Sequence, residues 1–165
     1  MSPALQAKLI EALAAELARD ETTTTAVPSG PDETNPSLFM EDWSGWSDAA
    51  REAIGQLNVH TYATGNRVLV RDVSKVTGIP LWMSEVEGDF GLWGHDQNDM
   101  NNGIGMAQAI IDDLRELEPV AWVFWQPVEN RWGSETYEGN WGSIYVDFDC
   151  DADGNYYRSG FGLNY

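Results

Sequence analysis

The feature of the sequence that most constrains its fold is a regular alternation of helical and strand-like segments. Helical spacing of apolar residues predicts helices at 1–20, 47–56, 66–77 and 104–117. Short runs rich in apolar and β-branched residues predict strands at 22–27, 57–62, 79–86, 120–126 and 143–149. Alternation of this kind predicts an α/β fold, in which helices cover a parallel sheet.

Several local details of this pattern are specific enough to test. Ser2 and Pro3 form a favourable helix start, and Gly78 is expected to stop the helix at 66–77. The strand at 22–27 is expected to end in a polar loop at 29–35. The helix at 104–117 is expected to bury one apolar side, formed by Ala107, Ile110, Ile111 and Leu114.

The length of the chain limits the architecture. Its 165 residues can form one domain with a real core, but a complete (β/α)₈ barrel typically needs about 250 residues. No repeat or interdomain linker divides the sequence. We therefore interpret residues 1–165 as one domain, with a helix at 1–20, βα units at 21–126, and a long loop with a short β tail at 127–165.

Charge and composition exclude some classes of partner. The chain has 27 acidic and 9 basic residues, a formal net charge of −18. Such a protein repels phosphate backbones and anionic lipids, so neither a nucleic acid nor a membrane is an expected partner. No apolar run reaches the roughly 20 residues that span a bilayer, and the N-terminal residues do not form a signal peptide. Cys150 is the only cysteine, so no internal disulfide forms.

Polar and aromatic residues gather where the predicted strands end. The carboxyl ends of parallel strands lie at one edge of a sheet, where ligands bind both in barrels and in doubly wound sheets. Neither a dinucleotide fingerprint nor a phosphate-binding lysine motif is present. These side chains therefore favour a neutral polyhydroxyl substrate, and an open α/β fold with an unrelated ligand is the alternative. The strand-end residues are Asp32, Glu33, His60, Tyr62, Ser84, Glu85, Trp125 and Gln126.

Three of these strand ends resemble a known enzyme family. Residues 58–62 (NVHTY), 81–88 (LWMSEVEG) and 123–127 (VFWQP) are similar to strands six, seven and eight of the glycoside hydrolase family 30 barrel, above all in its endo-β-1,6-galactanase-like members. The resemblance covers roughly residues 5–150. It implies a partial (β/α)₈ TIM barrel with about strands five to eight, their covering helices and a short β tail.

The resemblance also implies roles for individual residues. Glu85 matches the catalytic nucleophile, Tyr62 the tyrosine that hydrogen-bonds it, and Trp125 the tryptophan under the reactive sugar, while His60 lies beside them. Burial of Trp125 in the core is the alternative interpretation of that residue. Weaker correspondences extend the substrate cleft to Asp32, Glu33, Trp82 and Gln126.

The implied activity is hydrolysis of a β-linked galactan or related polysaccharide with retention, and no cofactor is expected. Retaining enzymes use two carboxyl groups about 5–5.5 Å apart. The family's acid/base Glu follows an Asn at the end of strand four, and no such pair precedes the first strand here. Glu33 could replace it only if the half barrel rearranged. A non-catalytic carbohydrate-binding or relic half barrel is the second hypothesis.

Partners and location follow from the same interpretation. A half barrel has exposed sheet edges, so we expect self-association or pairing with a missing N-terminal half. The family resemblance suggests an extracellular protein.

Asp149, Asp151 and Asp153 start a calcium-loop pattern and are weak metal candidates, but Gly160 stands where a bidentate Glu is needed. A tight hairpin turn is the alternative there.

Overall fold

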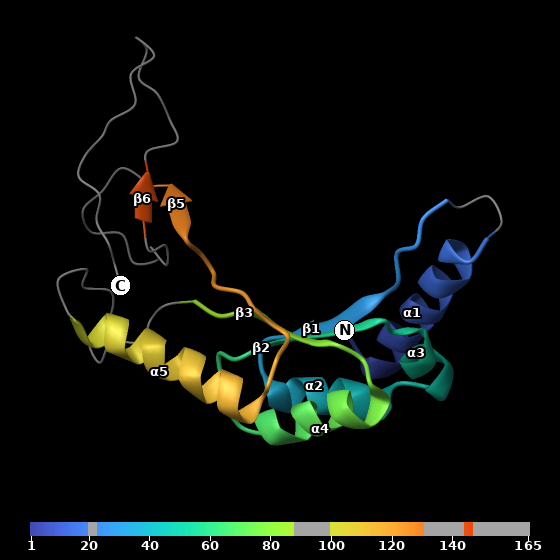
Figure 1. Cartoon of the computed structure of the whole chain (residues 1–165). Helices are drawn as coiled ribbons and strands as arrows, with labels where there is room; N and C mark the ends of the chain where they lie inside the picture. Colours follow the sequence, from blue (N-terminus) through green and yellow to red (C-terminus); the bar gives the residue numbers. More distant parts are fainter. Residues whose placement is uncertain (20–22, 88–99, 131–143, 147–165) are drawn as a thin grey trace, which may run out of the picture. The chain divides into compact units, whose positions relative to one another are not determined.

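The computed structural model describes residues 1–19, 23–87, 100–130 and 144–146 (Figure 1). Its residues group into two compact units. The first unit contains Met1–Glu85 and Asp112–Val123, and the second contains Val86–Ile111 and Phe124–Tyr165. The first unit holds the sheet on which the candidate site is built.

Four parallel strands form the sheet of the first unit. They are β1 (Ser29–Glu33), β2 (Gln56–His60), β3 (Leu81–Glu85) and β4 (Ala121–Trp122). Each strand pairs with the next one along the chain, in the order β1-β2-β3-β4. A doubly wound sheet reverses its order at a switch point, whereas a barrel does not. The fold is therefore α/β and has the strand order of part of a TIM-type barrel, as predicted.

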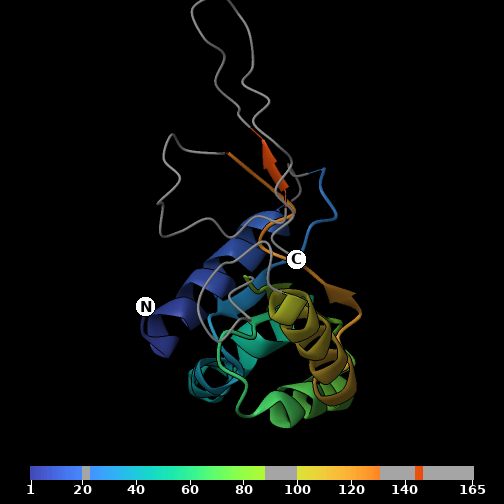
Figure 2. The ribbon, with the colours of Figure 1, turned by 90° about the vertical axis from the view of Figure 1, so that its left-hand side faces the viewer.

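Helices cover one face of this sheet. α2 (Pro36–Gly45) packs on β1 and β2 and against α4 (Arg67–Thr77), and both helices lie on the same side of the strands (Figure 1). α1 (Pro3–Leu17) packs against α2 and α3 (Asp48–Ala53). Figure 2 shows these helices from a second direction, α1 in blue and α4 in green.

The helix boundaries follow from local chemistry. The Asn35 side chain accepts hydrogen bonds from two backbone N–H groups at the start of α2, and Ser47 caps α3 through Ala50 N. α4 ends at Gly78, whose φ of 74° is the left-handed conformation that glycine adopts without strain. At Gly45 a Cβ would lie 2.5 Å from the Cβ of Pro3, so glycine allows α1 to approach α2 closely.

The two faces of the sheet differ in burial. Leu57, Val59, Leu81 and Met83 point toward the helices and are buried, together with Phe39 and Val70 of the helices themselves. Because side chains alternate along a strand, Trp82 lies on the opposite face, where it is 38% exposed. The face that would line the interior of a closed barrel is thus partly open to solvent in the described part of the chain.

The predicted strand at 22–27 is wrong. Residues 23–28 form no strand, and the side chains at 23–27 are exposed. The strand is instead β1, within the segment predicted to be a polar loop. Pairing with β2 and the burial of Gly30 decide where the strand forms, because tertiary contacts override β-propensity. The helix α2 was also not predicted.

The side of the helix at 104–117 predicted to be buried is also wrong. α5 (Met100–Glu116) starts earlier than expected, and Leu114 on the predicted inner side is 51% exposed. Asp113 and Leu117 are buried instead. The helical spacing was correct, but the polar contacts of Asp113 described below select the neighbouring side of the helix.

The described part of the second unit contains the start of α5 and a small parallel sheet. That sheet pairs β5 (Val128–Asn130) with β6 (Ile144–Val146). β6 lies within the strand predicted at 143–149, whereas β5 lies in the predicted long loop. The predicted strand at 120–126 is shorter than expected, since β4 ends at Trp122.

Asp149, Asp151 and Asp153 lie outside the described residues. Among the described helices, none has the length and apolarity to cross a bilayer.

Candidate active site

The candidate site lies at the carboxyl ends of β1, β2 and β3. His60 is the last residue of β2 and Glu85 the last of β3, and the two residues face each other in the strand register. Tyr62 follows two residues after the end of β2. Asp32 lies near the end of β1. The structure therefore brings together four of the predicted site residues, each from a strand end, at one edge of the sheet.

Two irregularities in the strand register determine the directions of these side chains. The pairing passes from Val59↔Met83 to His60↔Glu85, which leaves Ser84 as an extra residue in β3. In β1, Asp32 is the extra residue between Pro31 and Glu33, and it has a positive φ of 63°. Extra residues of this kind bend a strand and redirect its side chains. Here they bring Ser84 and Asp32 together across the end of β2.

The Tyr62 hydroxyl holds one oxygen of the Glu85 carboxylate, and the His60 ring lies beside that oxygen. The Tyr62 hydroxyl donates a hydrogen bond of 2.8 Å to Oε1 of Glu85. Nδ1 of His60 lies 3.6 Å from the same oxygen, and the two rings meet edge to face, with centroids 5.7 Å apart. The Glu85 side chain is 31% exposed. A carboxylate that is oriented by neighbouring side chains and still open to solvent can meet a substrate.

Asp32 and Ser84 support the other side of the imidazole. Nε2 of His60 lies 3.4 Å from Oδ1 of Asp32, and the Ser84 hydroxyl donates a hydrogen bond of 2.6 Å to that oxygen. His60 thus lies between two carboxylates, one near each ring nitrogen. Ser84 was among the strand-end residues of the sequence but was not predicted as a site residue. Its place directly before Glu85 in a strand-end motif is the signal that could have found it.

Glu33 points away from this group. Its Oε1 accepts a long hydrogen bond of 3.4 Å from Nε2 of Gln6 on α1, and the same amide donates to Asp42 at 2.7 Å. Burial, and then a hydrogen bond with the Asp42 carboxyl, raise the pKa of Glu33. The strand register explains the separation, because Glu33 pairs with the buried Val59, whereas Asp32 is the extra residue of the bulge. The contacts of Glu33 connect β1 to its helices.

The predicted aromatic residues are exposed. Trp82 occupies the open face of the sheet, beside the end of the strand that carries Glu85. Trp125 belongs to the second unit, where its backbone N–H donates to the carbonyl of Val86, and its side chain is 46% exposed. An indole exposed to this degree is not a core residue, which disfavours the alternative interpretation of Trp125. Gln126 follows Trp125 in the same unit.

The described residues contain no group of three or more His, Cys, Asp or Glu side chains that could hold a metal ion. The site of the first unit presents carboxylates, an imidazole, a phenol and a hydroxyl group. This combination suits proton and glycosyl transfer to and from a neutral sugar.

Comparisons with known proteins agree with the predicted resemblance. No family model matches the chain. The chain is 31% identical over 162 residues to an exo-β-1,6-galactobiohydrolase of Bifidobacterium longum subsp. longum, an alignment covering 93% of this chain and 10% of that protein. It is 30% identical over 105 residues to an endo-β-1,6-galactanase of Hypocrea rufa, covering 62% of this chain and 20% of that protein.

A solved structure supports the fold. The crystal structure of SrfJ from Salmonella typhimurium matches 84% of this chain and 31% of that chain, with a TM-score of 0.58 and 15% identity. The resemblance to β-1,6-galactan-degrading glycoside hydrolases is thus confirmed by sequence, and the partial barrel by structure. The chain spans a fifth or less of the length of these two curated relatives.

Proposed function

We propose that this chain forms the nucleophile-bearing part of a retaining glycoside hydrolase barrel, with Glu85 as the nucleophile. The observation that carries the proposal is the 2.8 Å hydrogen bond from Tyr62 to Glu85, beside His60, at the ends of adjacent parallel strands. The names of the two relatives support a β-1,6-linked galactan or related polysaccharide as substrate.

The proposed reaction is a double displacement. An oxygen of Glu85 forms a bond to the anomeric carbon, while the bond from that carbon to the leaving oxygen breaks and the leaving group takes the electron pair and a proton. In the second step, a deprotonated water attacks the same carbon and the Glu85 carboxylate departs. Tyr62 orients the Glu85 carboxylate, which attacks in the first step and leaves in the second. His60 and Asp32 lie beside this carboxylate and form the polar side of the site.

The proton in this mechanism requires a second carboxyl group. In retaining enzymes it lies about 5–5.5 Å from the nucleophile, and the family resemblance supports a position at the end of strand four of the barrel, before the strands of this chain. Glu33 is a poor substitute, because its contacts are with Gln6 and it shares that amide with Asp42. The acid/base is therefore supplied by complementary βα units that complete the barrel.

The exposed surfaces of the first unit fit such completion. β1 and β4 are the edge strands of the sheet, and edges of this kind pair with another chain or segment. Leu5, Leu9 and Leu13 form an exposed apolar stripe along α1. Pairing with complementary βα units or self-association would cover both features. Sedimentation velocity over a range of concentrations is expected to show association of the isolated chain, and a monomer at every concentration would contradict self-association.

A trapping experiment tests the nucleophile without the acid/base. With 2-deoxy-2-fluoro-β-galactosyl fluoride, an oxygen of Glu85 bonds to the anomeric carbon and fluoride leaves with the electron pair, so no proton donor is needed. Intact-mass spectrometry is expected to show one added fluorogalactosyl unit. Glu85→Gln should abolish the adduct, whereas Glu87→Gln, which removes a carboxyl group two residues further on, should retain it. An unmodified wild-type chain would contradict the proposal.

The second candidate function is carbohydrate binding without turnover. The exposure of Trp82 and Trp125 favours it, since exposed indoles present flat surfaces to sugar rings. Titration calorimetry with β-1,6-galacto-oligosaccharides distinguishes the two candidates. Binding that survives Glu85→Gln, together with no adduct in the wild-type chain, would support the binding function and exclude catalysis by Glu85.

A further inference from the structure

We infer that Asp113 is a positioning residue for this site, which holds Thr61 and thereby aims His60 and Tyr62 at Glu85. The inference rests on the proposed function, because it assigns the source of the nucleophile's orientation. Asp113 lies on α5, in the part of that helix that belongs to the first unit. It has no direct contact with the proposed reacting atoms and acts through Thr61.

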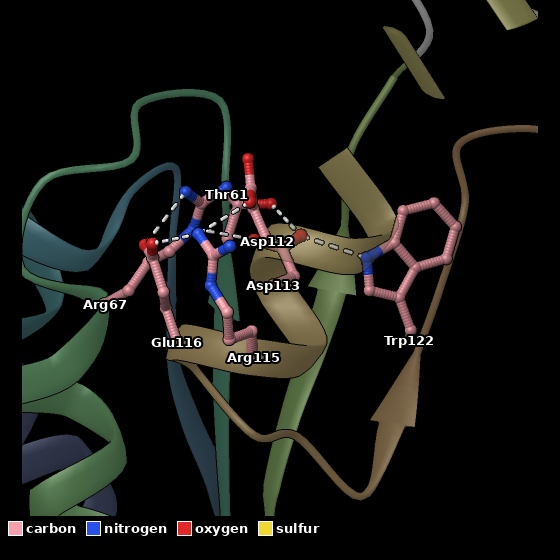
Figure 3. A network of polar contacts seen from close by, with 7 residues as sticks. All are labelled: Thr61, Arg67, Asp112, Asp113, Arg115, Glu116 and Trp122. Atoms are coloured by element: carbon pink, nitrogen blue, oxygen red, sulfur yellow. Dashed lines mark hydrogen bonds and ion pairs between the residues drawn. The ribbon is translucent and has the colours of Figure 1, made fainter. Parts of the chain in front are cut away.

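Asp113 joins three elements of the first unit (Figure 3). Its side chain is 0% exposed. Oδ2 accepts a hydrogen bond of 2.8 Å from the Thr61 hydroxyl and one of 3.0 Å from Nε1 of Trp122. Oδ1 forms an ion pair of 2.7 Å with Nε of Arg67, the first residue of α4. One carboxylate thus ties α5 to the end of β2, the start of α4 and β4.

Thr61 transmits this contact to the site. It lies between His60 and Tyr62, directly after the last residue of β2. Thr61 is 5% exposed and points to Asp113, whereas Tyr62 is 40% exposed and points to Glu85. Neighbouring side chains of an extended backbone point in opposite directions. Fixing the Thr61 side chain toward Asp113 therefore directs the side chains of His60 and Tyr62 to the opposite side, toward Glu85.

The hydrogen bond from Thr61 to Asp113 acts where strand pairing no longer fixes the backbone. The register between β2 and β3 shifts after Val59, and β2 ends at His60. Tyr62 therefore lies beyond the last paired residue of its strand. A hydrogen bond from the intervening Thr61 to a buried carboxylate supplies the constraint that strand pairing provides elsewhere.

The contacts that Asp113 makes with Thr61 and Trp122 explain its burial better than a gain in folding stability does. Removing a carboxylate and a guanidinium from water costs free energy, and apolar residues of similar volume often replace such pairs with no loss of stability. Leu117, four residues later and directly after the end of α5, is an apolar residue that is fully buried. What Asp113 provides and a leucine cannot is an acceptor for both Thr61 and Trp122.

Two substitutions at Thr61 test the inference and leave the buried ion pair intact. Thr61→Val keeps the shape and removes the donor, whereas Thr61→Ser keeps the donor. In trapping with the fluorogalactosyl fluoride, Thr61→Val is expected to lower kinact about ten- to a hundredfold with KI nearly unchanged. Thr61→Ser should remain close to wild type. Equal loss in both variants, or no loss in a folded Thr61→Val chain, would overturn the inference.

A spectroscopic readout keeps this test independent of turnover. In protein labelled with ¹³C-tyrosine, the Glu85→Gln variant identifies the Tyr62 resonance that responds to the loss of its carboxylate partner. Thr61→Val is expected to move that resonance and Thr61→Ser to leave it in place. A Tyr62 resonance unmoved by Thr61→Val would refute the positioning role even if the wild-type chain forms no adduct. An absent adduct with the expected shift would refute only the proposed function.

Discussion

The two central carboxylates of the first unit, Glu85 and Asp113, are held by different kinds of partner. Glu85 is partly exposed, and its donor is a neutral phenol. Asp113 is fully buried and paired with the guanidinium of Arg67. A neutral donor orients a carboxylate without cancelling its charge, whereas a cation neutralises it. The comparison teaches that one side-chain type can lie partly exposed beside a neutral donor at the edge of the sheet, or fully buried beside a cation within the same unit.

Removal of the buried carboxylate should have the largest effect on stability. Asp113→Ala leaves Arg67 buried without its counter-charge, and we expect the free energy of unfolding in urea to fall by about 3–5 kcal/mol. Glu85→Gln should change it by less than about 1 kcal/mol. Asp112→Ala is the matched control, because Asp112 pairs with the exposed Arg115. If Asp113→Ala lost no more stability than Asp112→Ala, the distinction between the two carboxylates would fail.

Removal of the Tyr62 hydroxyl, the neutral donor to Glu85, should have the next largest effect. It should slow the trapping reaction and leave the stability of the fold unchanged. Tyr62→Phe deletes only the hydroxyl that reaches Glu85. We expect kinact for trapping to fall about ten- to a hundredfold, the factor that corresponds to a hydrogen bond to a charged group. The urea midpoint should stay close to wild type, since Tyr62 is exposed. Unchanged trapping kinetics would mean that the hydroxyl does not orient the nucleophile.

The smallest effect is expected at Glu33, a third carboxylate of the first unit. Its pKa is raised above the ordinary value of 4.5, mainly by burial, so the folded state binds the proton more tightly than the unfolded state. Stability is therefore lost as the pH rises from 4.5 through the folded pKa. Glu33→Gln should remove this loss and be more stable than wild type at neutral pH, by less than about 1 kcal/mol.

Urea unfolding across the acidic range checks the sign of this prediction. The advantage of Glu33→Gln over wild type should grow as the pH rises above 4.5 and then become constant. An advantage that shrinks with rising pH would show that the folded state favours the ionised carboxyl group.

The sequence predicted most of what local chemistry determines. Apolar spacing and Pro3 predicted α1, although the Ser2 side chain forms no capping hydrogen bond, and Gly78 marks the end of α4 as predicted. The motifs at the ends of β2 and β3 predicted His60, Tyr62 and Glu85 as neighbours. These features depend on residues close together in the chain or on the shared edge of parallel strands.

The sequence failed where distant contacts decide the outcome. β1 has little strand propensity and is a strand because it pairs with β2. The buried side of α5 is selected by the contacts of Asp113 with Thr61 and Arg67, which lie far away in the sequence. An acidic residue three positions after Ile110 and four before Leu117, within a helical apolar pattern, was the available signal for a buried polar partner.

The most direct test of the central claim is to locate the trapped sugar. After reaction with 2-deoxy-2-fluoro-β-galactosyl fluoride, peptide mapping by tandem mass spectrometry identifies the esterified carboxyl group. We predict a single ester on Glu85, absent from Glu85→Gln. An ester on Asp32 or Glu33, or no ester on a folded wild-type chain, would contradict the assignment of Glu85 as the nucleophile.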